Sequence, residues 1–366
     1  MFDETAFRDP RLCRGLLDRL RRALDGEGRS MRFMEVCGTH TVAIFQSGLS
    51  SMLPENVAHI SGPGCPVCVT HDAEIALMLN LAGRENLILA TFGDLLRVPG
   101  PEGTSLKHAK AAGASVEIVY SPLEALTLAE KNPAAVVVFP GIGFETTAPT
   151  VAATVLTARQ KKLDNFCVLC LHKLVPPALR ALLDDDTSAQ IDAFLLPGHV
   201  STVIGLEPYA FLARDYHMPA VVGGFEPADI LLALSLMAEQ LRDHAPAVCN
   251  AYPRAVNDAG NPRARALTDM VFRPCDALWR GLGAIPESGL ALAPEYADMD
   301  AAKRFNLALE QHPEPKGCRC GDVLKGRASP PQCPLFGKKC TPAAPVGPCM
   351  VSTEGSCAAW HNYMET

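Results

Sequence analysis

Residues 134–171 read AAVVVFPGIGFETTAPTVAATVLTARQKKLDNFCVLCL and contain a strand, a helix and a second strand in succession. The apolar, β-branched segment Ala134–Phe139 predicts a buried strand, and a glycine-rich turn follows it. Thr147–Lys161 has the residue spacing of a helix, and Asn165–Leu171 is again apolar. Such a unit favours parallel strands that are covered by helices on both faces of the sheet.

The same alternation extends along the chain in both directions. Six more strands are expected at Phe33–Val36, Val57–Ser61, Asn86–Thr91, Ser115–Tyr120, Ala193–Leu196 and Ala220–Val222. Four more helices are expected at Asp72–Leu81, Pro122–Glu130, Pro176–Leu183 and Pro227–Leu241. We expect the strands to form two sheets of four, because each half of this region then has the length of a typical domain.

The sequence therefore predicts an α/β protein with two Rossmann-like domains, residues 31–132 and 133–235, that face each other across a cleft. After the last of these helices the periodicity weakens into loops and short helices. An amphipathic helix expected at Leu12–Leu24 has no strand beside it in the sequence. We therefore expect residues 1–30 to join residues 236–366 in a third domain.

Composition and charge narrow the class of protein. The chain has 366 residues, a formal charge of −7 and no basic block, which argues against a nucleic-acid partner. No apolar run is long enough to cross a membrane, and the N-terminus lacks a signal-peptide pattern, so we expect a cytoplasmic protein. Its fourteen cysteines are then expected to be metal ligands, catalytic thiols or buried side chains. Five fit simple packing, namely Cys13, Cys167, Cys170, Cys249 and Cys275.

Two cysteine motifs follow the first two strands. Cys37-Gly-Thr-His40 follows the first strand, and Gly62-Pro-Gly-Cys65-Pro-Val-Cys68 follows the second. Ligands of α/β proteins bind at the carboxyl ends of the strands, so both motifs are candidate sites. Cys65 and Cys68 resemble a redox dithiol, but zinc binding with Cys37 and a histidine, or plain packing, is also open. His40 can ligate an atom that Cys37 holds, or it can donate a hydrogen bond beside it.

Three further turns carry polar side chains at strand ends. Gly141–Thr147 suggests phosphate binding at a helix N-terminus, but it lacks the third glycine and the lysine that such loops need. The simpler interpretation is a helix start that is capped by Thr146 or Thr147. His199 and Glu226 follow glycines at two later strand ends, and we expect them to line the second wall of the cleft.

Six cysteines lie in the last 49 residues, at Cys318, Cys320, Cys333, Cys340, Cys349 and Cys357. Residues 313–348 contain eight prolines and five glycines, so apolar burial alone does not fold this segment. The spacing lacks the paired knuckles of a zinc ribbon. An all-thiolate set on irregular backbone favours a four-iron cluster over zinc, and the two surplus thiols are expected to form a redox pair beside it.

Six motifs occur in order across nearly the whole chain, namely Cys37–His40, Gly62–Cys68, Gly143–Thr147, Gly317–Gly321, Gly347–Ser352 and Glu354–Cys357. In this order they resemble the HypD family of hydrogenase maturation factors. The resemblance implies a scaffold on which the Fe(CN)2CO unit of [NiFe] hydrogenases is assembled. It also implies a complex with the small chaperone HypC and delivery of cyanide by HypE, which carries a thiocyanate.

The resemblance also implies a cofactor in the third domain. The family's ligand pattern places a [4Fe-4S] cluster on Cys318, Cys333, Cys340 and Cys357. Cys320 and Cys349 remain as a thiol pair or disulfide near that cluster. Electrons would pass from the cluster through this pair to Cys65 and Cys68.

The remaining residues of the implied site belong to the upstream motifs. Cys37 would hold the assembling iron, His40 would hydrogen-bond a cyanide nitrogen, and Glu145 of the Gly143–Thr147 motif is a further candidate catalytic residue. An alternative function is an iron–sulfur thiol–disulfide oxidoreductase that acts on a protein disulfide, and another is a non-catalytic iron–sulfur scaffold. The isolated Cys37 argues against the oxidoreductase, which needs only a dithiol and a cluster.

Overall fold

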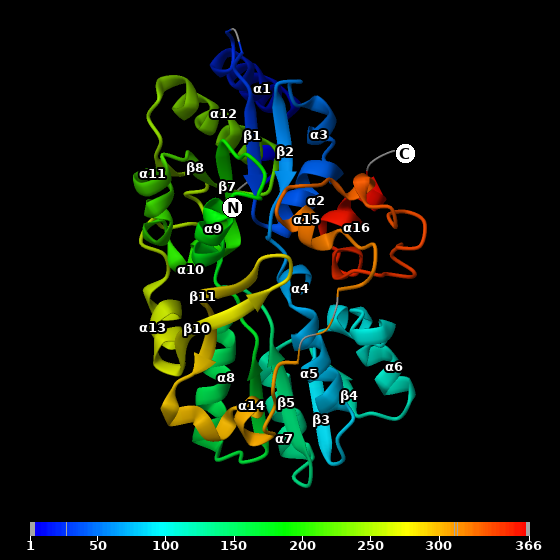
Figure 1. The fold of residues 1–366 in the computed structure, drawn as a ribbon. Helices are drawn as coiled ribbons and strands as arrows, with labels where there is room; N and C mark the ends of the chain where they lie inside the picture. The colour runs from blue at the N-terminus through cyan, green and yellow to red at the C-terminus, as the bar shows by residue number, and fades with distance from the viewer. Residues whose placement is uncertain (1–3, 27, 311, 313, 364–366) are drawn as a thin grey trace.

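The computed structural model describes residues 4–26, 28–310, 312 and 314–363. One parallel sheet has five strands in the order β2-β1-β7-β8-β9 (Figure 1). In that order the strands span Val57–Ser61, Met31–Glu35, Ala193–Pro197, Ala220–Gly223 and Val248–Asn250. The central strands are buried on both faces, which explains why they consist of nearly continuous apolar residues.

A second parallel sheet has four strands in the order β4-β3-β5-β6. In that order they span Val116–Ile118, Leu87–Thr91, Val136–Gly141 and Phe166–Cys170. All eight strands expected from the sequence are therefore present, and the parallel α/β architecture is confirmed. Segments that follow strands of both sheets meet in one buried cluster, which includes Val36, Cys65, Phe144 and Val175.

The strands are divided between the sheets differently from the expectation. The ranges 31–132 and 133–235 each contain strands of both sheets, because β1 and β2 belong to the five-stranded sheet and β3 and β4 to the four-stranded sheet. The chain returns to the five-stranded sheet after β6, where β7 pairs with β1 through Ala193 and Phe33. Strand periodicity reports burial and not the pairing partner, so the prediction of two sheets of four consecutive strands is wrong.

Helices occupy most connections between the strands, and the six helices expected from the sequence are present as α1, α5, α7, α8, α9 and α12. The α-helices span α1 (Pro10–Ala23), α2 (Gly38–Gln46), α3 (Leu49–Met52), α4 (Pro66–Val69), α5 (Asp72–Ala82), α6 (Leu106–Ala111), α7 (Pro122–Lys131), α8 (Ala148–Lys161), α9 (Val175–Asp184), α10 (Gly198–Ile204), α11 (Ala210–Tyr216), α12 (Pro227–Asp243), α13 (Pro262–Val271), α14 (Ala301–Arg304), α15 (Cys320–Leu324) and α16 (Ser356–Tyr363). Short 3₁₀ turns span η1 (Glu4–Arg8), η2 (Gly93–Arg97), η3 (Pro101–Gly103), η4 (Glu207–Tyr209), η5 (Pro294–Met299), η6 (Pro330–Gln332) and η7 (Pro348–Met350).

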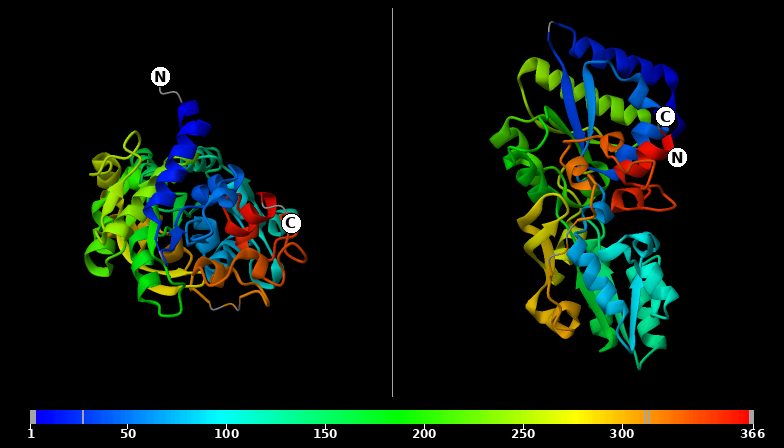
Figure 2. Two further views of the ribbon diagram at one scale, coloured as in Figure 1. Left: turned by 90° about the horizontal axis from the view of Figure 1, so that it is seen from above. Right: turned by 45° about the vertical axis from the view of Figure 1, so that its right-hand side comes forward.

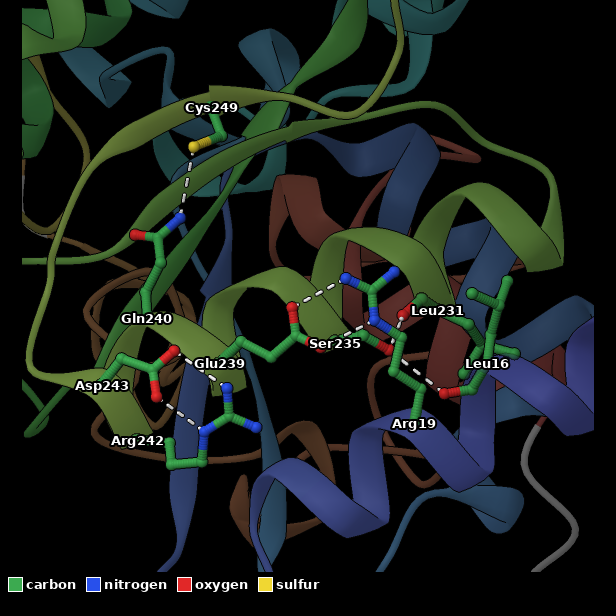
Figure 3. A network of polar contacts seen from close by, with 9 residues as sticks. All are labelled: Leu16, Arg19, Leu231, Ser235, Glu239, Gln240, Arg242, Asp243 and Cys249. Carbon is green, nitrogen blue, oxygen red and sulfur yellow. Dashed lines mark hydrogen bonds and ion pairs between the residues drawn. The ribbon is translucent and has the colours of Figure 1, made fainter.

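The N-terminal helix α1 packs on α12, which covers one face of the five-stranded sheet (Figure 3). Arg19 donates two hydrogen bonds of 2.7 Å to Glu239, and the Ser235 hydroxyl donates to the Leu16 carbonyl over 3.1 Å. Leu20 joins the core of this sheet. The expected third domain built from both chain ends is not confirmed, because α1 packs with the helix and core of the five-stranded sheet.

An antiparallel hairpin that the sequence did not reveal lies between the two sheets (Figure 1). Its strands β10 and β11 span Phe272–Trp279 and Gly283–Leu292. Pro274 and Pro286 interrupt the two strand patterns, so the alternation of a strand is hard to recognise there. At the tip of the hairpin Trp279 is fully buried and stacks on Phe144 at 6.1 Å.

The cysteine-rich tail has little regular structure. It runs from the region of the four-stranded sheet back to the five-stranded sheet, where α16 packs against α2 (Figure 2). Phe45 on α2 and Trp360 on α16 pack with 5.1 Å between their ring centres. None of the helices in the described part of the chain has the length and apolar character that a membrane-spanning helix needs.

Candidate metal and thiol centre

Cys37 lies between strand β1 and helix α2, in contact with the next cysteine motif. The Gly38 N–H donates to the Gly64 carbonyl over 2.9 Å. A Cβ on Gly64 would lie 2.1 Å from the Cys37 nitrogen, so only glycine permits this approach of two backbones. The loop that carries Cys65 therefore touches the loop that carries Cys37.

The Cys37 thiol is buried between two carboxylates. The Glu35 carboxylate accepts from the Cys37 N–H over 2.9 Å, and the Glu354 carboxylate of the tail accepts from the Thr39 hydroxyl over 2.7 Å. A Cβ on Gly38 would lie 2.3 Å from the Glu354 carbonyl oxygen, so the tail closes directly over this loop. Burial, followed by the charges of Glu354 and Glu35, raises the pKa of Cys37 to about 12. The same surroundings favour a metal cation, which neutralises the carboxylates and displaces the thiol proton.

His40 is completely buried one helical turn after Cys37, and its two ring nitrogens differ. Nε2 lies 3.0 Å from the Gly224 carbonyl oxygen, whereas Nδ1 has no hydrogen-bond partner. The ring packs on Phe225 with 4.6 Å between the ring centres. Burial lowers the pKa of His40 to about 4, so the imidazole is neutral.

The Cys65–Cys68 pair reaches the tail directly. Cys65 caps helix α4, and its sulfur accepts from the Cys68 N–H over 3.3 Å. Cys68 is fully buried, and its thiol interacts with Cys349 of the tail as well as with Cys65. Burial raises the pKa of Cys68 well above the usual value for a thiol. The fold thus joins two thiol groups that are far apart in the sequence.

The tail thiols also interact with one another. Cys349 interacts with Cys320 and Cys357, and Cys318 interacts with Cys320. Cys340 lies within electrostatic reach of Cys318. These interactions gather three of the expected cluster ligands around the Cys320 and Cys349 pair.

The fourth expected ligand, Cys333, lies beside the same group. Its thiol donates weakly to the Gly317 carbonyl over 3.7 Å. A Cβ on Gly347 would lie 2.7 Å from the Cys318 sulfur and 3.3 Å from the Cys320 sulfur, so the glycine leaves room for the thiols. All fourteen cysteines are free, and among the described residues no group of three or more His, Cys, Asp or Glu side chains is arranged to hold a metal ion. The thiols are nevertheless of the residue type that a four-thiolate cofactor needs.

Two buried ion pairs fix helix α5, which begins just after the Cys68 motif. Asp72 accepts hydrogen bonds of 2.6 and 2.8 Å from Arg280 at the hairpin turn, and Arg280 also donates to the Thr70 carbonyl over 3.0 Å. Glu74 pairs with Lys173, which follows β6, over 2.5 Å. Arg280 also lies within electrostatic reach of two tail thiols. These residues could not be predicted, because single charged residues in separate segments of a sequence give no signal of their pairing.

Glu145 lies on the side of the four-stranded sheet, at an apolar cavity of about 350 Å³. Its Oε1 accepts from the Val175 N–H over 2.8 Å, and Oε2 is buried without a partner. Burial raises the pKa of Glu145 to about 7. Thr147 is the residue that precedes α8, but its hydroxyl donates to the Phe144 carbonyl and makes no capping bond.

The two residues expected on a second wall of the cleft have different surroundings. His199 stacks on Phe225 at 4.1 Å, so this ring lies next to both His199 and His40. Glu226 instead pairs with Arg8, with one bond of 2.9 Å, and caps helix α12. Only His199 of these two is therefore near the Cys37 loop.

The cysteines expected to serve packing lie outside the thiol group. Cys13 and Cys167 are buried, and Cys170, Cys249 and Cys275 are partly buried. Cys167 and Cys170 belong to different hydrophobic clusters of the four-stranded sheet, in keeping with the expected opposite faces of the strand.

Known proteins with similar sequences reveal the family of this chain. A family model, HypD, described as "Hydrogenase formation hypA family", matches residues 11–364. The chain belongs to the HypD family. It is 49% identical over 338 residues to hydrogenase maturation factor HypD of Escherichia coli K12, which covers 92% of this chain and 90% of that protein. The HypD proteins of Azotobacter vinelandii and Rhodobacter capsulatus are 46% and 45% identical over 98% of this chain and 95% and 97% of their own length.

Membership in the HypD family confirms the resemblance that the six motifs carried. It assigns the chain a role in hydrogenase maturation. In this HypD chain the motifs meet physically, because the Cys37 loop touches the Cys65 loop and the Glu354 segment, and Cys68 touches Cys349.

Proposed function

We propose that this chain is the scaffold on which the Fe(CN)2CO unit of [NiFe] hydrogenases is assembled, with Cys37 as a ligand of the iron. The observation that supports this proposal is that two other cysteine-bearing segments contact the Cys37 loop. Gly64 contacts it from the Cys65–Cys68 loop, and Glu354 contacts it from the cysteine-rich tail. A thiolate is a soft ligand that suits low-spin iron with cyanide and carbonyl. Glu35 and Glu354 supply negative charge beside it.

The iron unit is a substrate that must be built and passed on. We propose that a HypC-type small chaperone binds the chain during assembly and that a HypE-type protein with a thiocyanate group supplies the cyanide. Cys37 is only 7% exposed, which protects an iron–carbonyl unit from water and oxidants. Its covering segment, around Glu354, belongs to the irregular tail and is the element whose displacement opens the site.

We further propose a resident [4Fe-4S] cluster on Cys318, Cys333, Cys340 and Cys357. When bound, it would supply one-electron transfer next to the thiol pairs. The chain's own part is the contact series Cys320, Cys349, Cys68 and Cys65, along which dithiol–disulfide exchange can proceed. Each conversion of two thiols to a disulfide releases two electrons and two protons.

Infrared spectroscopy of the anaerobically purified complex with its small chaperone tests the proposal. The wild-type chain should show cyanide and carbonyl stretching bands, and Cys37→Ala should lose them while it keeps about four iron and four sulfide per chain. Cys249→Ala, a partly buried thiol outside the site, is the control and should keep the bands. Bands that persist in Cys37→Ala would place the iron elsewhere.

A second candidate function is a thiol–disulfide oxidoreductase that acts on a protein disulfide. The contact between Cys68 and Cys349 favours it, because it joins the two dithiols without any need for Cys37. Such an enzyme would show no cyanide or carbonyl bands in any form. It would also reduce its protein disulfide equally well in the wild type and in Cys37→Ala.

A further inference from the structure

We propose that His40 is a second protein ligand of the iron that Cys37 holds, and that it binds through Nδ1. The inference rests on the proposed function, because it names a further contact of the same iron. It also decides between the two roles that the sequence leaves open for His40, metal ligation and hydrogen-bond donation.

The position of the ring proton follows from one hydrogen bond. The Gly224 carbonyl oxygen can only accept, and it lies 3.0 Å from Nε2 of His40, so Nε2 carries the proton. Nδ1 of the neutral ring therefore presents a lone pair. Metal-bound histidines typically donate their other ring N–H to a carbonyl or carboxylate, which fixes the ring and increases its basicity as a ligand. His40 has this arrangement already.

The lone pair of Nδ1 is buried and unsatisfied. His40 is 0% exposed, and Nδ1 has no hydrogen-bond partner. A buried polar atom without a partner destabilises the folded chain, so its retention points to a partner that is acquired in function. His172 is also buried without partners, but neither of its nitrogens is anchored by a carbonyl, and its ring packs on Phe272.

The fold places the two ligands on one helical turn. Cys37 precedes the first residue of α2, and the His40 N–H donates to the Cys37 carbonyl over 2.9 Å. The side chain of an N-cap residue lies over the first helical turn, beside the backbone of the third helical residue, which is His40 here. The Phe225 ring and the Gly224 carbonyl oxygen both contact the imidazole. The ring is thus fixed before any metal binds.

Donation to a cyanide nitrogen requires the proton on Nδ1 instead. If the proton moved from Nε2 to Nδ1, the lone pair of Nε2 would face the Gly224 carbonyl oxygen. The hydrogen bond between these two atoms would then be lost. Imidazole is a good ligand for iron, and two protein ligands leave most positions of a six-coordinate iron open for diatomic ligands and a partner protein.

The test is infrared spectroscopy of the complex that carries His40→Gln, with His172→Gln as the matched control because His172 is also a buried imidazole without hydrogen-bond partners and lies outside the site. A lost ligand changes the electron density on iron, so the carbonyl band and the cyanide bands should shift together in His40→Gln. An iron(II) chelator should also remove the iron unit at least about tenfold faster, as expected for disruption of a metal's ligand set. His172→Gln should leave the bands and the removal rate unchanged, and the iron and sulfide of the tail should persist in both variants.

A shift confined to the cyanide bands, or one that follows exchange into D2O, would make His40 a hydrogen-bond donor and overturn the inference. Unchanged bands and an unchanged removal rate would also overturn it. If His40→Gln loses the tail iron through misfolding, His40→Gly with added imidazole replaces it, and failure of imidazole to restore the wild-type bands counts against the inference. Bands that persist in Cys37→Ala would instead reject the proposed function.

Discussion

The loop around Cys65 and Cys68 and the tail that carries Cys349 bring thiols to the same place by different means. The loop is held by backbone contacts at glycines, and the helix that follows it is fixed by two buried ion pairs. The tail has few regular elements and is ordered by turns and thiol contacts. We therefore expect the polypeptide alone to organise the loop, and the tail to depend on the cluster that we propose for its thiols.

The largest expected effect is loss of order in the tail when its iron is removed. Metal–thiolate bonds supply folding free energy directly, so chelation should lower the local free energy of opening by several kcal/mol. Amide hydrogen exchange of residues 316–352 should become fast, while β7 stays protected. A tail that remains protected without iron would remove the distinction between the two regions.

Breaking one ion pair beside the loop should have the next largest effect. Asp72→Asn leaves the Arg280 guanidinium buried and without its carboxylate, which typically costs about 3–5 kcal/mol of unfolding free energy. Asp243→Asn is the control, because its pair with Arg242 is exposed to solvent and such pairs contribute little to stability. Urea denaturation of the anaerobic protein measures both. Equal costs would show that the loop needs no such support.

The sequence predicted the strands well, because their burial is a local property. The segments at Ala193–Leu196 and Phe166–Cys170 are continuous apolar runs, and both form buried strands in the structure. The pairing of β1 with β7 depends on how the chain crosses between the sheets, which no local pattern encodes. The hairpin escaped prediction because Pro274 and Pro286 interrupt it.

Only those residues of the candidate site whose type is itself unusual, such as cysteines in turns, could be predicted from the sequence. Cysteines in turns after strands pointed to Cys37 and Cys65. Glu354 lies in a motif of the tail. Its contact with the Cys37 loop joins distant parts of the chain, so the spacing of residues in the sequence does not reveal it. Glu35 is hidden in the same way, since a glutamate near the end of a strand is usually exposed and here is 1% exposed.

A smaller effect should come from the carboxyl group that supports the loop from the four-stranded sheet. Glu145 accepts from Val175, which packs in one cluster with Cys65 and Cys68. Its pKa is about 7 in the folded chain and 4.5 in the unfolded chain, so Glu145 is neutral when folded and ionised when unfolded between these values. Its contribution to stability is complete below pH 4.5 and is lost as the pH rises to 7, which amounts to about 3 kcal/mol.

Glu145→Gln should therefore flatten the fall of stability between pH 5 and pH 7, as measured by urea denaturation across that range. Glu130→Gln is the control, because Glu130 is 39% exposed in a surface pair with Lys161 and should leave the slope unchanged. An unchanged slope in Glu145→Gln would mean that this carboxyl group does not support the loop in its neutral form.

Substitution of the two loop thiols, Cys65 and Cys68, should have the smallest effect on folding and should nevertheless abolish function. Serine is nearly isosteric with cysteine, and an oxygen at position 65 can accept the same hydrogen bond from the N–H of residue 68, so Cys65→Ser should cost only about 1 kcal/mol. Cys68→Ser should behave alike, and both variants should keep the tail cluster and bind the small chaperone. Hydroxyl groups neither form disulfides nor ligate soft metals, so both variants should fail to mature hydrogenase in cells, whereas Cys249→Ser should mature it normally. Normal hydrogenase activity in cells that carry either loop variant would remove the pair from the mechanism and leave it a role in packing alone.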